Sequence, residues 1–199
     1  MDGSASLAGS TPVDINNRNE TLETGLDDLK SQLKNAYQTL ADGRKIFIPE
    51  LEALGQLAKD NGLNLDLLLK KITLSETGHV VKAVFAPLLN LKDIQAISGL
   101  TSLTSLNMGG CLVSDISPLG CLTSLTWLNL ENNQIIDPTA LSGLTSLTSL
   151  SIGGNQISDI SALTGLTGLN RLELFNNPLS EAANEIVEMI RNNAVEVHR

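Results

Sequence analysis

Histidine and cysteine, the residues best suited to metal binding or nucleophilic chemistry, are scarce in this chain of 199 residues. It has two histidines, His79 and His198, and two cysteines, Cys111 and Cys121. No combination of them has the spacing of a zinc site, and no nucleophile elbow or phosphate-binding loop is present. The sequence therefore predicts a protein that is not an enzyme and that uses no metal or cofactor. Both cysteines are expected to be free thiols.

The composition narrows the classes of partner. The formal net charge of −9 repels phosphate backbones, which makes nucleic acid a poor partner. No segment approaches the roughly 18 consecutive apolar residues of a membrane-spanning helix. Residues 1–6 lack the basic and apolar regions of a cleavable signal peptide. These features favour a cytoplasmic protein, and export without a cleavable signal stays open as an alternative.

A repeat of 22 residues dominates the sequence from Leu100 onward. Its copies begin LTSLTSLNMGG at Leu100, LTSLTWLNLENN at Leu122, LTSLTSLSIGGN at Leu144 and LTGLNRLELFNN at Leu166. A weaker copy precedes them, with apolar positions expected at Val81, Val84, Leu91, Ile94 and Ile97. Self-similarity at a fixed period of this length is the signature of a solenoid. We therefore assign residues 78–177 to an array of repeats.

Each repeat predicts one strand and one buried polar site. In Leu106-Asn107-Met108 and its equivalents, apolar and polar residues alternate, as in a strand with one buried face. A fixed polar position follows each strand, and it is occupied by Cys111, Asn133, Asn155 and Asn177. An amide there can satisfy backbone groups that a sharp turn buries. We expect these four residues to form a structural ladder, with Cys111 packing at its first position.

The residues NQISDISALTGLTGLNRLELFNN from Asn155 to Asn177, with SDISPL from Ser114 to Leu119, resemble the leucine-rich repeats of bacterial internalins. The resemblance implies an α/β solenoid, a right-handed superhelix with parallel strands on its concave face. It also implies that this face binds a protein partner.

Strand parity identifies the residues expected on the concave face. Most of them are small and neutral, so Trp127 stands out as a candidate contact, because tryptophan and arginine are enriched at binding hot spots. The predicted partner-binding residues are Trp127, Asn107, Asn129, Glu131, Arg171, Glu173 and Phe175. The alternative for Trp127 is a lone exposed aromatic ring that leans on its neighbours.

The two ends of the chain have different compositions. Residues 1–20 are polar and aperiodic and are expected to be flexible, and residues 21–77 predict about three helices. The first is expected to end at Gly43, the second to open at Pro49, and the third to run from Asn64 to about Ile72. The helices are expected to cover the first repeat, and the first could also form a coiled-coil dimer.

Residues 178–199 predict a C-terminal cap. Ser180 is the expected N-cap of a helix over residues 181–192, and residues 194–197 could add a final strand. The apolar face of this helix is expected at Ala182, Ile186, Met189 and Ile190.

Three functions remain open on the sequence. The first is a binding module for a protein partner that the sequence does not identify. The second is a structural subunit that docks through its N-terminal helices. The third is an exported effector.

Overall fold

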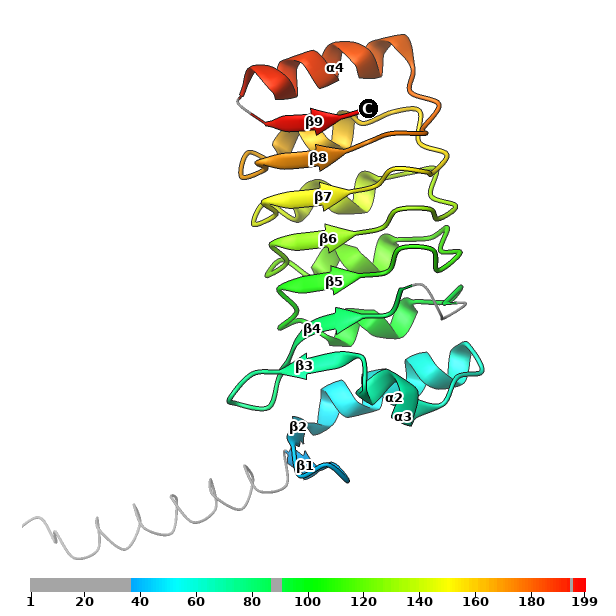
Figure 1. Ribbon diagram of the computed structural model, residues 1–199, viewed down its shortest axis with the longest axis vertical. Coiled ribbons are helices and arrows are strands. Elements are labelled where there is room, and N and C mark those ends of the chain that lie inside the picture. Colours follow the sequence, from blue (N-terminus) through cyan, green and yellow to red (C-terminus); the bar gives the residue numbers. More distant parts are fainter. Residues whose placement is uncertain (1–36, 87–90, 194) are drawn as a thin grey trace, which may run out of the picture. The chain divides into compact units, whose positions relative to one another are not determined.

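One seven-stranded sheet organises the repeats, with the strand order β3-β4-β5-β6-β7-β8-β9. The computed structural model describes residues 37–86, 91–193 and 195–199. Figure 1 shows the strands of the sheet stacked in chain order, with the return segments behind them. Neighbouring strands from β4 to β9 are parallel, and β3 is antiparallel to β4.

The strands are short, and from β5 to β8 they recur at even spacing along the chain. Those of the large sheet are β3 Ile72–Leu74, β4 Val80–Val84, β5 Ser105–Asn107, β6 Trp127–Asn129, β7 Ser149–Ser151, β8 Arg171–Glu173 and β9 Glu196–His198. The return segments carry the 3-10 helices η1 Gln95–Gly99, η2 Ser117–Cys121, η3 Thr139–Gly143 and η4 Ser161–Gly165. The α-helices are α2 Ile48–Asp60, α3 Leu65–Leu69 and α4 Glu181–Asn192. Across the described residues, none of the helices is both long and apolar enough to cross a membrane.

The core lies between the sheet and the 3-10 helices. Leu106, Leu128 and Leu150 pair in register across β5, β6 and β7, and all three are fully buried. Burying a leucine contributes about 1.5–3 kcal/mol relative to leaving it exposed. Because a single repeat cannot cover its own leucines, stability requires neighbouring coils to stack.

Aspartates start the 3-10 helices. In each coil one carboxylate accepts a hydrogen bond from the backbone N–H two residues later, over 2.8–3.0 Å. These aspartates are Asp93, Asp115, Asp137 and Asp159. The bond holds the first turn of a helix that is too short to be stable alone.

The first coil is one residue longer than the sequence period indicates. Ala83 pairs with Leu106, a spacing of 23 rather than 22 residues, and the fully buried residues are Val80 and Ala83 on β4 and Phe85 directly after it. The expectation that Val81 and Val84 are core positions is therefore wrong, since both are only partly buried. Leu91, Ile94 and Ile97 are buried as expected.

The region before the repeats contains strands as well as helices. Strands β1 Tyr37–Thr39 and β2 Lys45–Phe47 form a two-stranded sheet, so the expectation of a helix up to Gly43 is wrong at its C-terminal end, and the rest of that helix lies outside the described residues. The second expected helix is present as α2, with its proline in the first turn. The third, α3, ends at Leu69, because the chain turns into β3 to extend the sheet.

Helix α4 packs at the C-terminal end of the stack, beside η4 and β9 (Figure 1). Ser180 is its N-cap and accepts a hydrogen bond from Ala183 N over 3.1 Å. The buried face consists of Ala183, Val187 and Ile190. Of the expected face, Ile190 is buried, Ile186 is partly buried, and Ala182 and Met189 are exposed. The final strand forms as β9, parallel to β8.

Candidate protein-interaction face

The face of the parallel sheet that points away from the leucine core, here named the outer sheet face, presents two rows of side chains. The strand register places the first row at Lys82, Ser105, Trp127, Ser149, Arg171 and Glu196. The second row is Val84, Asn107, Asn129, Ser151, Glu173 and His198. Each row draws one residue from each of six strands, so residues 22 to 25 positions apart become direct neighbours.

Trp127 lies on this face between two serines. Its neighbours in the row are Ser105 on β5 and Ser149 on β7, and its side chain is partly buried. The ring is not part of the leucine core, which is formed by Leu125, Leu128 and Leu130 in the same coil. Small neighbours leave one large aromatic surface available on the sheet.

Asn107 and Asn129 close the turns at the ends of their strands. The Oδ1 atom of Asn107 accepts a hydrogen bond from Gly109 N over 3.0 Å, and that of Asn129 accepts one from Glu131 N over 2.8 Å. Each oxygen is therefore engaged once within the chain, and the amide NH₂ groups are available as donors to a ligand.

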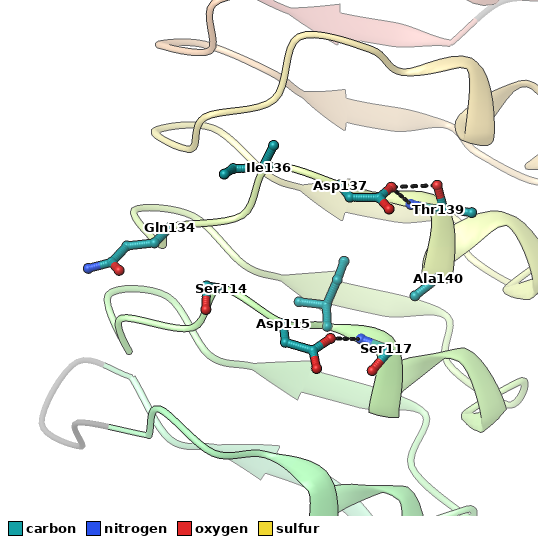
Figure 2. Close-up of a pocket in the computed structure, with 9 residues that line it drawn as sticks. Ser114, Asp115, Ser117, Gln134, Ile136, Asp137, Thr139 and Ala140 are labelled. Carbon is teal, nitrogen blue, oxygen red and sulfur yellow. Dashed lines mark hydrogen bonds between the residues drawn. The ribbon is translucent and has the colours of Figure 1, made fainter.

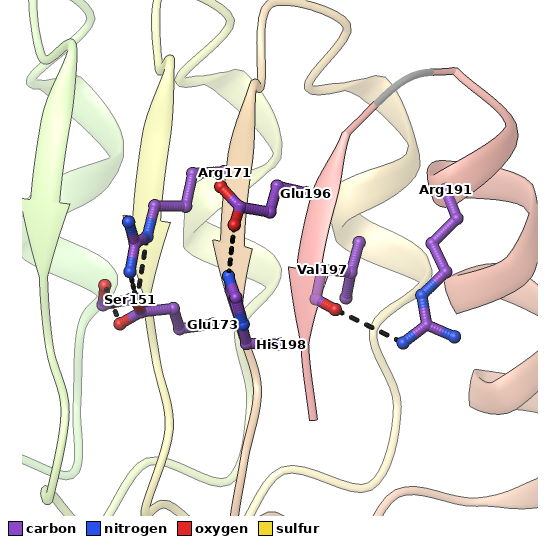
Figure 3. A network of polar contacts seen from close by, with 7 residues as sticks. All are labelled: Ser151, Arg171, Glu173, Arg191, Glu196, Val197 and His198. Carbon is purple, nitrogen blue, oxygen red and sulfur yellow. Dashed lines mark hydrogen bonds and ion pairs between the residues drawn. The ribbon is translucent and has the colours of Figure 1, made fainter.

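The C-terminal part of the outer sheet face holds a polar network, which Figure 3 shows. The guanidinium of Arg171 donates to Glu173 Oε1 from Nε over 2.9 Å and from Nη2 over 2.6 Å, while Ser151 Oγ donates to Glu173 Oε2 over 2.8 Å. On the next strand, His198 Nε2 lies 2.9 Å from Glu196 Oε1. Much of the charge on this part of the face is thus paired internally.

Glu131 and Glu173 interact across two coils. The hydrogen bond from Glu131, together with those from Ser151 and Arg171, lowers the pKa of Glu173 to about 2. Partial burial, followed by the hydrogen bond and repulsion from Glu173, raises the pKa of Glu131. Two adjacent carboxyl groups resist double ionisation, so the proton stays on Glu131 to a higher pH than on an isolated glutamate.

Phe175 covers a glycine. A Cβ atom built on Gly153 would lie 2.7 Å from the Phe175 ring, so the ring rests directly on the backbone of the preceding coil. The ring is partly buried by this contact, and it closes the C-terminal side of the surface that begins at Trp127.

The asparagine ladder lies behind the turns at the strand ends. Asn133 Oδ1 accepts from Cys111 N over 3.2 Å and from Val113 N over 2.9 Å, and its Nδ2 donates to Met108 O and Leu130 O, both over 2.9 Å. Asn155 and Asn177 repeat this pattern one and two coils later. These amides bind coil to coil and do not reach the outer sheet face.

Cys111 occupies the first ladder position without an amide to donate. It is fully buried, and burial raises the pKa of its thiol to about 11. Its Sγ lies 3.9 Å from Gly109 O. Cys121 is exposed at the end of η2, and neither cysteine forms a disulfide, which confirms the expectation of free thiols.

A hollow with a volume of about 570 Å³ lies beside the turns into η2 and η3, away from the outer sheet face (Figure 2). Its carboxylates are already engaged, Asp115 with Ser117 N and Asp137 with Thr139. These bonds lower the pKa of both aspartates. The apolar Ile136 at its rim is 63% exposed.

Sequence reasoning missed a buried carboxylate at the N-terminal end. Glu50 on α2 is 2% exposed, and its Oε2 accepts a hydrogen bond from Val80 N over 2.7 Å, while Oε1 lies 3.5 Å from His79 Nδ1. Burial raises the pKa of Glu50. The sequence did contain a sign of this burial, because Glu50 lies one turn before Leu54 on an otherwise apolar face of the helix. Among the described residues, no group of three metal-ligating side chains occurs.

Comparison with known proteins agrees with this architecture. A family model described as leucine-rich repeats in two copies matches residues 123–165 and 145–185. No curated protein matches the chain.

Solved structures with the same kind of repeat are similar to this chain, and two of them illustrate the likeness. An internalin from Listeria monocytogenes has 38% sequence identity over 59% of this chain, at a TM-score of 0.53, and this chain covers 33% of that internalin. The leucine-rich-repeat ectodomain of the receptor kinase SOBIR1 from Arabidopsis thaliana has 20% identity over 77% of this chain and 92% of its own length, at a TM-score of 0.58, which concerns the fold alone. The chain is a leucine-rich-repeat protein with repeats of the internalin type.

Proposed function

We propose that the chain is a non-catalytic interaction module that binds a protein partner with the outer sheet face, which would be the concave face of the solenoid. The observation that carries the proposal is Trp127, a large aromatic side chain kept outside the core and flanked by two serines. A solenoid with this many short parallel strands offers a broad, stiff surface, which suits a protein more than a small molecule.

The energetics favour an aromatic anchor at this place. A tryptophan ring can bury about 150–250 Å² on contact, and few rotatable bonds are frozen when it does. Hot-spot rings of this kind dominate binding when smaller neighbours exclude water around them. We infer that Glu131, Arg171, Glu173 and Phe175 add a polar and aromatic border on the C-terminal side of Trp127, and that the amide groups of Asn107 and Asn129 contribute on β5 and β6.

The two ends would serve as caps. We infer that α4 covers the last repeat with Val187 and Ile190, and that α2 covers the first, where Ala53 lies 2.9 Å from a Cβ built on Gly99 of η1. A solenoid with open apolar ends associates nonspecifically, so closed ends leave the outer sheet face as the place for specific binding.

Photo-crosslinking tests the binding face. A photoreactive amino acid replaces Arg171 on the outer sheet face, Ser142 on η3, or Glu52 on α2, all of which are exposed. The intact protein is then irradiated among the proteins of the cells that produce it. The proposal expects a specific adduct from position 171 only, and that adduct disappears in the Trp127→Ala protein. Adducts from position 52 alone would instead support a structural subunit that docks through the N-terminal region.

A further inference from the structure

The N-terminal half of the outer sheet face contains a hollow of about 310 Å³, here named the notch, lined by Lys82, Val84, Ser105, Asn107 and Trp127. These five residues come from three adjacent strands, β4, β5 and β6. The notch is separate from the paired charges around Arg171 and Glu173, which lie on β8.

The strand register explains why the surface is hollow there. Lys82, Ser105 and Trp127 stand in one row, with the smallest of the three in the middle. Strands lie about 4.8 Å apart, so the backbones that carry the lysine and the tryptophan are separated by about 10 Å. The short side chain of Ser105 lies between the longer side chains of Lys82 and Trp127. Val84 and Asn107 line the notch in the next row.

The polar groups of the notch are mainly hydrogen-bond donors. Lys82 is exposed and carries an ammonium group, and among the ion pairs of the described residues none involves it. Asn107 has already committed its Oδ1 to Gly109 N, so its amide offers NH₂. No carboxylate lines the notch. In a chain with a net charge of −9, one ammonium group with no lining carboxylate makes the notch locally favourable for an anion.

We propose that the notch binds an acidic side chain, aspartate or glutamate, of the partner protein. The carboxylate pairs with the Lys82 ammonium and accepts from the Asn107 amide, while its methylene groups lie against the Trp127 ring and Val84. One cation and neutral donors suit a singly charged carboxylate, whereas sites for doubly charged phosphate groups typically gather arginines. This inference rests on the proposed function of the outer sheet face.

The fluorescence of Trp127 can report binding at the notch, because Trp127 is the only tryptophan in the chain. Peptides of twelve random residues are selected by display on the intact protein, and each selected peptide is titrated while Trp127 emission is recorded. The proposal expects selected peptides to be enriched in aspartate and glutamate and to change the emission. Replacing the critical acid with its amide should weaken binding about fivefold to tenfold.

Variants of Lys82 identify the pairing. Lys82→Met keeps the aliphatic stem and should weaken binding as much as the amide peptide does, with no further loss when both changes are combined. Lys82→Glu should bind the peptide whose acid is replaced by lysine. Lys59→Met removes the same charge from α2 and should leave affinity unchanged. Circular dichroism verifies that each variant is folded.

The outcomes separate the two proposals. Peptides that change Trp127 emission but bind the Lys82→Met protein with unchanged affinity overturn the proposal for the notch and still support the interaction face. Peptides that leave the emission unchanged and bind the Trp127→Ala protein equally well overturn both. Tighter binding of a phosphoserine in place of the acid, or a library without any binder, also overturns the notch, while the crosslinking experiment still tests the face.

Discussion

Asn155 is a buried ladder residue whose loss should lower the stability of the fold. Its Nδ2 donates to Leu130 O, Ile152 O and Gly153 O over 2.9–3.2 Å, and its Oδ1 accepts from Ile135 N over 3.1 Å. Asn155→Ala leaves these buried backbone groups unpaired, so the free energy of unfolding should fall by about 1–3 kcal/mol. Urea denaturation measures the change. Asn170→Ala, on an exposed side chain, is the control, and equal stability of the two variants would contradict the ladder.

The Glu131–Glu173 pair gives a pH dependence with a definite sign. Because the pKa of Glu131 is raised in the folded state, the folded protein takes up a proton before the unfolded chain does as pH falls, and this group stabilises the fold toward lower pH. Glu173, with its pKa lowered to about 2, acts oppositely and loses its contribution as pH falls from about 4.5 toward that value.

Glu131→Gln isolates the first effect. The amide keeps a donor for Glu173 but cannot ionise, so the variant should be more stable than the parent at pH 7. The difference between their free energies of unfolding should shrink as pH falls through the folded-state pKa of Glu131, because the parent also becomes neutral at this position. Denaturant unfolding at several pH values measures this difference. Glu52→Gln removes an equal charge from α2 and should show no such trend, and a constant difference for Glu131→Gln would refute the coupling.

Among structural elements, the turn after each strand depends on left-handed backbone. Gly110, Asn132, Gly154 and Asn176 occupy one position 22 residues apart, all with φ between 54° and 71°. Glycine and asparagine are the residues that adopt this conformation most readily, which explains why these two residues alternate at this position of the repeats. Leu112 departs from this rule, because it has a φ of 63° without being either residue.

Leu112→Gly should therefore stabilise the protein. The leucine is 38% exposed, so little packing is lost, while relief of the backbone strain should gain about 0.5–1 kcal/mol. Gln134→Gly is the matched control, since Gln134 occupies the same position in the next coil without positive φ. That change should lower stability, because glycine gains freedom in the unfolded chain. Thermal unfolding measures both, and destabilisation by Leu112→Gly would show that its side chain matters more than its backbone.

The elements that the sequence predicted well are those fixed by short-range repetition. Strands, ladder and return segments recur every 22 residues, and each recurrence independently supports the same assignment. The apolar face of helix α4 was predicted less well. Its apolar residues span a wide arc, so helical periodicity allows a face through Ala182 and Met189 as readily as the one through Ala183 and Val187 that packing selects. The side-chain network of Glu131 and Glu173 joins residues 42 positions apart in the sequence, a relationship that no local pattern records.

At the scale of the whole molecule, the stacking of coils divides the outer sheet face into two parts of different character. Toward β8 and β9 the polar side chains are hydrogen-bonded to one another within the chain, as Arg171 is to Glu173 and His198 is to Glu196. Toward β4 the side chains of Lys82 and Trp127 line the notch from two strands that flank β5. A partner lying across the strands would therefore meet the Lys82 ammonium at one end and internally hydrogen-bonded side chains at the other, which favours one direction on the sheet.

The same stacking predicts how the molecule loses its structure. Each coil is stabilised by its neighbours, so the end coils should open more readily than the central coils around β6, and amide exchange should be slowest there. Val187→Asp places a charge in the buried contact of α4 with the last coil, and exchange should then rise first in β9, β8 and η4. Met189→Asp, on a side chain that is 47% exposed, should leave the profile unchanged. Hydrogen exchange followed by mass spectrometry resolves the coils individually. An equal rise in every coil for Val187→Asp would mean that the repeats unfold as one indivisible unit, and that α4 stabilises all of them rather than the end that it touches.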